Sequence, residues 1–202
     1  MSTFLALGDS YTIGEGVALD KRWPAQLVAR LRNEGIDVGD PQIVATTGWT
    51  TDELAAAMDT ASFAAPYGLV TMLIGVNNQY RGRPLDEYRA QLHALLQRAT
   101  KLAGGNTEHV LVVSIPDWGV TSFAAREGRD ASGIARQIDA FNAAACAEAR
   151  EVGAQWVDVT TISRASDARN ELVGDGLHPS GAQYARWTEA ILPVAQKILA
   201  RD

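Results

Sequence analysis

Cysteine and basic residues are scarce in this 202-residue chain, and each shortage excludes a class of function. The single cysteine, Cys146, rules out an internal disulfide framework and a zinc site made of several cysteines. It lies at the edge of an apolar helical stripe, which suits a small core residue. Lys and Arg number 18 against 24 Asp and Glu, which gives a net charge of −6. That balance argues against a nucleic-acid partner, because such proteins present a basic face.

Long hydrophobic runs are absent as well. No apolar stretch approaches the roughly 20 residues that cross a bilayer, so we expect no stable membrane association. Residues 1–3 carry no basic group, and the apolar run after them is too short for a signal peptide, which predicts a cytoplasmic protein. With 47% hydrophobic residues, the chain predicts a single domain over residues 1–202. No pattern predicts an oligomeric state.

Short apolar runs alternate with longer amphipathic segments along the chain. The runs are rich in Val, Ile and Leu and predict buried strands at residues 4–7, 43–46, 69–74, 110–115 and 156–159. Apolar residues three and four apart predict helices at residues 23–31, 85–102, 134–152 and 188–199, with Pro84 in the first turn of the second. Parallel strands need crossover connections, so this alternation predicts an α/β fold with a parallel sheet and helices on both faces.

Polar segments follow the predicted strands, at the edge where ligands bind in such sheets. They are Gly8-Asp9-Ser10, residues 47–51, residues 75–80, residues 116–119 and the "DGLHPS" stretch at residues 175–180. Because the carboxyl ends of parallel strands meet at one edge, these segments are expected to converge on one site.

A serine, a histidine and an aspartate within these segments suit nucleophilic catalysis. A serine hydroxyl needs a neighbouring base, and histidine has the pKa for that task. Of the three histidines, His93 and His109 are most simply surface residues. His178 follows Asp175 by three positions, and Pro179 keeps it out of helical geometry, so the two side chains meet through a turn. Asp175 would fix the imidazole tautomer and leave the other nitrogen for Ser10.

Acyl transfer also needs donors directed at the developing oxyanion. Gly48 offers a backbone N–H without a side chain in the way, and Asn77 offers its carboxamide. The N–H of Ser10 would be the third donor. We therefore predict Ser10, Asp175 and His178 as catalytic residues, with the oxyanion held by Ser10, Gly48 and Asn77.

Four segments in order resemble the SGNH/GDSL hydrolase family of esterases and lipases. They are "ALGDSYTIGEG", "ATTGWTTDEL", "LIGVNN" and "DGLHPSGAQYARW", which together span residues 6–187. The resemblance implies a three-layer α/β/α sandwich with a central five-stranded parallel sheet, flavodoxin-like in topology. It places the family's Ser, Gly, Asn and His on Ser10, Gly48, Asn77 and His178, with Asp175 as the supporting acid. The family commonly has Asp where this chain has Asn78, which puts the bracing of that loop and any pocket contact in question.

Each of these residues also has a structural interpretation. Ser10 could be a helix N-cap, Gly48 a turn glycine, and Asn77 a residue that satisfies its own loop. Asp175 and His178 could be turn and cap residues. Asp9 is expected to brace the nucleophile loop rather than act chemically. Candidates for the substrate pocket stand near strand ends, where aromatic residues also serve in packing: Trp49, Asn78, Tyr80 and Trp118.

The sequence therefore predicts a serine esterase that hydrolyses small or short-chain carboxylic esters through an acyl-enzyme, without cofactor or metal. No His-Glu-x-x-His segment or ligand cluster supports metal hydrolysis, and the glycine-rich loop lacks the Gly-Lys-Ser/Thr end of a phosphate-binding loop. Lysophospholipase, thioesterase and carbohydrate O-acetylesterase activities remain open. So does a small-molecule-binding module that has kept the fold and lost catalysis.

Overall fold

Five parallel strands form the central sheet of the computed structural model, which describes residues 1–200. The strands are β1 (Phe4–Gly8), β2 (Gln42–Ala45), β3 (Leu69–Leu73), β4 (Val110–Val113) and β5 (Gln155–Val157). The predicted parallel sheet is confirmed. β4 and β5 each end two residues before the predicted boundary, because the next backbone groups bind side chains: Asn142 accepts from Ile115 N, and Ser114 accepts from Val159 N.

Nine α-helices and four short 3₁₀ segments surround the sheet in residues 1–200. The helices are α1 (Ser10–Ile13), α2 (Trp23–Asn33), α3 (Thr51–Thr60), α4 (Val76–Tyr80), α5 (Leu85–Leu102), α6 (Ser122–Arg126), α7 (Ala131–Val152), α8 (Thr160–Arg164) and α9 (Gly181–Leu199). The 3₁₀ segments are Leu19–Lys21, Thr107–His109, Trp118–Val120 and Ala168–Asn170.

The four predicted helices are present as α2, α5, α7 and α9. Pro84 caps α5 from outside and does not lie in its first turn. α3 was not among the predicted helices, although it begins with a capping box: Thr50 and Glu53 bond to each other's backbone N–H. Its apolar stripe is short, with only Leu54 and Met58 as buried hydrophobic residues, so periodicity gave a weak signal.

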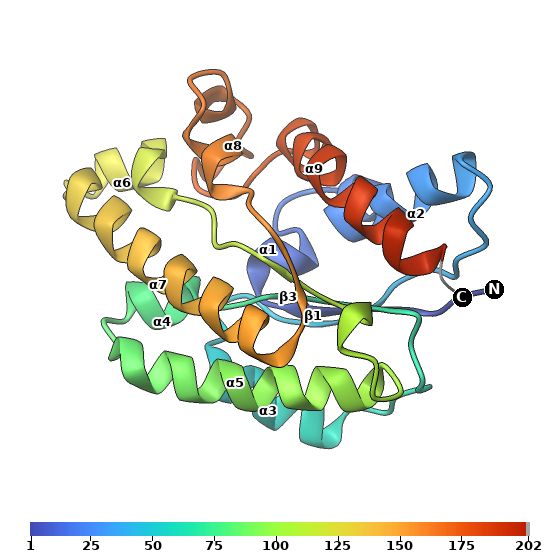
Figure 1. Cartoon of the computed structure of the whole chain (residues 1–202). Helices are drawn as coiled ribbons and strands as arrows, with labels where there is room; N and C mark the ends of the chain where they lie inside the picture. Colours follow the sequence, from blue (N-terminus) through green and yellow to red (C-terminus); the bar gives the residue numbers. More distant parts are fainter. Residues whose placement is uncertain (201–202) are drawn as a thin grey trace.

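Helices cover both faces of the sheet (Figure 1). α2 packs against α9 on one face, and α5 packs against α3 and α7 on the other. The three central strands β1, β3 and β4 are buried over their whole length, whereas most residues of the edge strands β2 and β5 are half-buried. Each layer contributes large side chains to one continuous core, such as Trp23 from α2, Trp187 from α9 and Tyr88 from α5.

The strand order β2-β1-β3-β4-β5 determines where a site can form. The chain runs from β1 to β2 on one side and then crosses back to β3 on the other side of β1. The connections after β1 and β3 therefore leave on opposite faces and open a crevice at their carboxyl ends. Ser10 follows β1 there, and Asn77 follows β3. No helix in residues 1–200 is long and apolar enough to cross a membrane.

Candidate active site

Ser10 is the first residue of α1, directly beyond the carboxyl end of β1. Asp9, not Ser10, is the N-cap of this helix, since its Oδ1 accepts the Tyr11 N–H at 3.0 Å. Gly8 brings β1 close to its neighbour: a Cβ there would lie 2.5 Å from the Leu73 carbonyl oxygen. The N-cap role that was considered for Ser10 therefore belongs to Asp9. The Ser10 side chain does not cap the helix.

The side chains of Asp175 and His178 contact each other through a turn, as the sequence predicted. His178 Nδ1 lies 2.6 Å from Asp175 Oδ2, and Asp175 Oδ1 accepts the backbone N–H groups of Leu177 at 2.7 Å and His178 at 3.0 Å. Partial burial would raise the pKa of Asp175, but these hydrogen bonds outweigh it and hold the pKa below its ordinary value. An ionised carboxylate can only accept, so Nδ1 carries the proton and Nε2 is left as a base.

The two further oxyanion candidates lie in the segments that follow β2 and β3. Gly48 has φ +89°, a conformation that favours glycine, and its carbonyl accepts from Arg81 at 2.6 Å. Asn77 lies on α4, and its Nδ2 donates to the Trp49 carbonyl at 2.9 Å. That bond uses one of the two amide hydrogens and leaves the other available. The bond also ties the loop after β2 to the helix after β3.

A cavity of about 180 Å³ brings most of the predicted site residues together. Its lining consists of Ser10, Tyr11, Thr47, Gly48, Val76, Asn77, Tyr80, Trp118, Phe123, Leu177 and His178. Apart from Ser10, the oxyanion candidates and His178, this lining is predominantly apolar and aromatic. In residues 1–200 no direct hydrogen bond joins the Ser10 hydroxyl to the His178 ring, although both border the same space.

Three predicted site residues do not line this cavity. Asp175 stands behind His178, as an orienting acid would. Asn78 is fully buried, and its side chain accepts from Thr51 N at 3.1 Å and donates to Thr51 Oγ1 at 2.7 Å. Trp49 packs against the core and contributes its carbonyl to Asn77. Asn78 therefore braces the start of α3 against α4, which is the bracing role that the sequence comparison left in question.

Five lining residues were not predicted from the sequence: Tyr11, Thr47, Val76, Phe123 and Leu177. Four of them are next to a predicted site residue in the sequence, so their closeness to the motifs could have predicted that they line the cavity. Phe123 is different, because it comes from α6 and only the fold brings it to the cavity.

Tyr80 and Trp118 form an aromatic wall of the cavity, and hydrogen bonds hold this wall in place. Trp118 Nε1 donates to Gln79 Oε1 at 2.7 Å, and the rings of Tyr80 and Trp118 meet edge to face with centroids 5.3 Å apart. Asp117, the residue before Trp118, accepts hydrogen bonds from Gly119 N at 2.8 Å and from Arg164 Nε at 2.8 Å. These contacts fix the loop after β4, so the wall is preformed.

Asp9 is fully buried beside the nucleophile. Its Oδ1 caps α1, whereas Oδ2 has no hydrogen-bond partner in residues 1–200. Burial, which disfavours the charged form, raises the pKa of Asp9 to about 7. The side chain therefore holds its proton below that pH, and its contact with Tyr11 agrees with the predicted bracing of the nucleophile loop.

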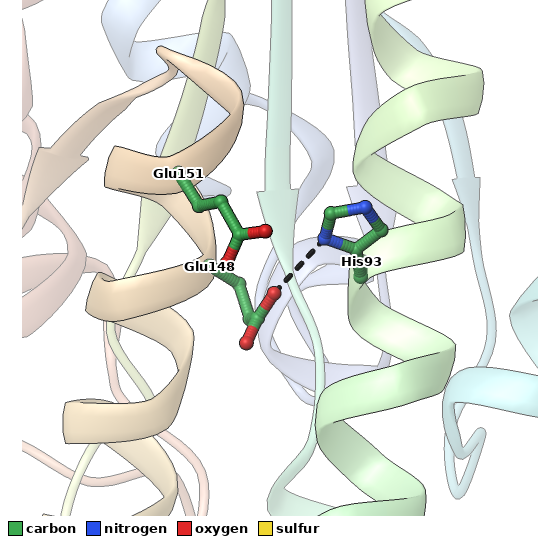
Figure 2. Close-up of side chains that lie close together, drawn as sticks. All are labelled: His93, Glu148 and Glu151. Atoms are coloured by element: carbon green, nitrogen blue, oxygen red, sulfur yellow. Dashed lines mark hydrogen bonds and ion pairs between the residues drawn. The ribbon is translucent and has the colours of Figure 1, made fainter.

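The other two histidines are not simple surface residues, so that prediction is wrong. His109 is buried, and His93 is half-buried because α5 and α7 pack together. Figure 2 shows His93 on α5 facing Glu148 and Glu151 on α7. His93 Nδ1 lies 3.0 Å from Glu148 Oε2, and Arg89 donates to Glu148 Oε1 at 3.0 and 2.8 Å.

This cluster is the one group in residues 1–200 whose ligand atoms lie close enough together to hold a metal ion. The Arg89 guanidinium already neutralises the buried Glu148 carboxylate, so we interpret the cluster as an ion-pair network that joins α5 to α7. His93, Glu148 and Glu151 do not line the cavity that holds Ser10 and His178.

Comparison with solved structures finds the same fold in several proteins, two of which are named as esterases. TesA is 22% identical with a TM-score of 0.74, and the match covers 97% of this chain and 99% of that chain. The psychrotrophic esterase EstA from Pseudoalteromonas sp. is 17% identical with a TM-score of 0.75, covering 99% and 100%. Axe2, an acetylxylan esterase from Geobacillus stearothermophilus, is 20% identical with a TM-score of 0.73, covering 96% and 94%. A search of curated proteins gave no match.

The sequence matches the GDSL-like Lipase/Acylhydrolase family over residues 6–186, which is most of the chain. All four quoted segments fall within this match apart from the last residue, Trp187. This family match makes the protein an SGNH-type serine hydrolase. The chain belongs to the GDSL-like lipase/acylhydrolase family.

Proposed function

We propose that this hydrolase cleaves carboxylic esters of small or short-chain acyl groups through a covalent acyl-enzyme on Ser10. One observation supports this most: Ser10 and His178 border the same cavity while Asp175 holds His178 Nδ1 at 2.6 Å. That arrangement fixes the tautomer in which Nδ1 faces Asp175, so that the ring's other nitrogen, Nε2, is the one that can act on Ser10. A productive complex requires the Ser10 hydroxyl to turn toward Nε2, a contact that commonly tightens when substrate binds.

Acylation follows from these positions. Nε2 of His178 takes the hydroxyl proton as Ser10 Oγ attacks the ester carbonyl carbon, which becomes tetrahedral and negatively charged on oxygen. The imidazolium that forms is stabilised by the Asp175 carboxylate. When the tetrahedral intermediate collapses, the bond to the alcohol oxygen breaks and His178 gives its proton to that oxygen. The alcohol leaves, and the acyl group remains on Ser10.

Deacylation repeats the cycle with water in place of the hydroxyl. His178 removes a proton from water, the resulting hydroxide attacks the acyl carbon, and His178 then protonates Ser10 Oγ as the carboxylic acid leaves. In both halves the oxyanion is held by the N–H groups of Ser10 and Gly48 and by the free amide hydrogen of Asn77. Loss of one such donor typically costs about 100- to 1000-fold in rate.

The cavity suits a short acyl group or a small alcohol. Its volume is about 180 Å³ and its walls are largely apolar, which favours a compact ester over a long lipid chain. The related structures carry names such as acetylxylan esterase, so a carbohydrate O-acetylester is among the alternatives, with lysophospholipids and acyl thioesters. A module without catalysis is the remaining alternative.

A substrate series on wild type and Ser10→Ala tests this function. The series comprises p-nitrophenyl esters with acyl chains from acetyl to dodecanoyl, and an acetylated sugar followed by acetate release. We expect the highest kcat/KM at the short end. We also expect Ser10→Ala to lose at least about 1000-fold in kcat.

Ser62→Ala is the matched control, because Ser62 is exposed and its hydroxyl lies outside the cavity. It should keep full activity. Labelling with an organophosphonate should add mass only to the peptide that contains Ser10. Equal activity of wild type and Ser10→Ala would refute the mechanism, and label on another peptide would refute the nucleophile. Ligand binding without hydrolysis of any ester would favour the non-catalytic module.

A further inference from the structure

Two arginines beside the catalytic cavity have no carboxylate partner. Most of the described arginines form ion pairs, such as Arg164 with Asp117 and Arg186 with Asp167. Arg126, on α6, and Arg129, just beyond it, form none within residues 1–200. Arg22, Arg150 and Arg169 form no ion pair there either, but Arg126 and Arg129 differ in that they contact residues of the candidate site: Arg126 contacts Asp175, and Arg129 contacts the Tyr80 and Trp118 rings.

Arg129 lies against the aromatic wall of the cavity. Its guanidinium carbon is 5.1 Å from the centroid of the Tyr80 ring and 5.4 Å from that of the Trp118 ring. Both rings line the cavity, and Tyr80 is 45% exposed, which places this part of the wall at the mouth. A cation–π contact does not use the N–H donors of a guanidinium as hydrogen bonds, and no acceptor binds those of Arg129 within residues 1–200, so they are free to donate.

Arg126 adds a second positive charge beside the candidate site. It donates to the Asp175 carbonyl at 2.5 Å and to Ser122 Oγ at 3.3 Å, so it is tied to the turn that carries His178. Both of its acceptors are neutral, and the charge stays uncompensated. The acidic neighbours of Arg129 in the chain do not neutralise it: Glu127 has no ion pair in the described residues, and Asp130 lies 3.9 Å from Arg136.

We propose that Arg129, supported by Arg126, forms an anion subsite at the mouth of the cavity, and that the preferred substrates are esters with a second, negatively charged group. The inference rests on the proposed esterase function and narrows its substrate class. The N–H groups along one edge of a guanidinium can donate two parallel hydrogen bonds to the oxygens of a carboxylate or a phosphate, so either anion fits. The apolar cavity would receive the uncharged part of the ester.

A purely structural role for Arg129 predicts a different result. If the guanidinium only stiffens the wall through its contact with the two rings, its loss would affect charged and neutral esters alike. Substrate pairs that differ by one anionic group separate the two roles, because the comparison removes any general loss of activity.

The experiment measures kcat/KM in a pH-stat for two such pairs. In the first pair the charge is on the alcohol: monobutyrin against 1-butyryl-glycerol 3-phosphate. In the second it is a carboxylate on the acyl group: ethyl hexanoate against monoethyl adipate. Wild type is expected to prefer the charged member of at least one pair. Arg129→Gln should reduce that preference about fivefold, mainly through KM, and Arg129→Lys should retain part of it.

Arg150→Gln serves as the control, since Arg150 is an exposed arginine near the end of α7 that lies outside the cavity and forms no ion pair in residues 1–200, and its loss should leave the preference unchanged. Raising the salt to about 0.5 M should weaken the preference more in wild type than in Arg129→Gln, which keeps only the charge of Arg126. Parity within both pairs in wild type, or an unchanged preference in Arg129→Gln, would overturn the subsite. Failure to hydrolyse even the neutral esters, including the p-nitrophenyl series, would instead refute the proposed esterase function.

Discussion

Asp9 shows how a single residue couples the stability of the nucleophile loop to pH. Its carboxyl group is fully buried, one oxygen caps α1, and the other has no partner in residues 1–200. The folded protein therefore favours the protonated form, with a pKa of about 7 against an ordinary value of 3.8. Between these two values the folded state binds more protons than the unfolded state, so stability falls as pH rises through that window and levels off above pH 7.

Asp9→Asn removes this titration and keeps the oxygen that accepts from Tyr11. Relative to wild type, the variant should gain about 2 kcal/mol in free energy of unfolding as the pH goes from 5.5 to 8. Urea denaturation at several pH values measures this. Asp20→Asn, at an exposed aspartate paired with Lys21, is the control and should follow wild type. Parallel curves for wild type and Asp9→Asn would contradict the assignment.

Asn78 is a second residue whose role depends on its exact chemistry. Its amide donates to Thr51 Oγ1, while the Thr51 hydroxyl in turn contacts Gln91 Oε1. Asn78→Asp, which restores the residue common in the family, replaces that donor by an acceptor. We expect a loss of about 1–2 kcal/mol in free energy of unfolding, because one buried polar group is left without its partner.

The same variant separates bracing from substrate contact. Asn78 does not line the cavity, so KM for a short ester should stay within about twofold of wild type. Steady-state kinetics on p-nitrophenyl butyrate, run beside the denaturation curves, provides the check. A large rise in KM with unchanged stability would mean that Asn78 contacts substrate after all.

At the scale of elements, α4 can be built only on a glycine. Gly75, its N-cap, has φ +128°, and a Cβ there would lie 2.5 Å from the Tyr88 ring. Gly75→Ala therefore combines backbone strain with a clash against a buried aromatic residue. We expect it to cost more than about 3 kcal/mol in stability and to reduce kcat, since α4 carries Asn77.

Gly82→Ala is the matched comparison for this element. Gly82 also has a positive φ, +67°, but no atom lies within 4 Å of the Cβ position. Gly82→Ala introduces backbone strain but no clash, so it should lower the free energy of unfolding by about 1 kcal/mol and leave kcat unchanged. Thermal denaturation and kinetics on the two variants decide the matter, and equal costs would show that the contact with Tyr88 is unimportant.

At the scale of the whole molecule, the buried side chains of both helical layers and the sheet form one continuous cluster. Such a core should unfold as a unit if the chain is a single domain. Trp23, Trp118 and Trp187 are almost completely buried in different parts of the fold, so their fluorescence reports on all of it. We expect the fluorescence and far-UV circular dichroism transitions in urea to coincide. Separate midpoints would contradict the single domain.

The sequence by itself determined the fold class and the identity of the main site candidates. Strands that lie between two helical layers are mainly apolar, and long helices must present an apolar stripe, so β1–β5 and α2, α5, α7 and α9 could be predicted. The order of the "GDS", "TGWT", "GVNN" and "DGLHPS" segments also sufficed to select Ser10, Gly48, Asn77, Asp175 and His178. These are local patterns, set by spacing along the chain.

Only the tertiary structure decided how side chains from separate segments are used. It assigned the helix cap to Asp9, turned Asn78 inward to Thr51, and brought Phe123 to the cavity. It also buried His109 and paired His93 with Glu148, against the expectation of two surface histidines. The burial of a side chain and the identity of its partners depend on the packing of elements far apart in the sequence. The hydrophobic periodicity of the sequence does not indicate which neighbour a polar side chain will contact.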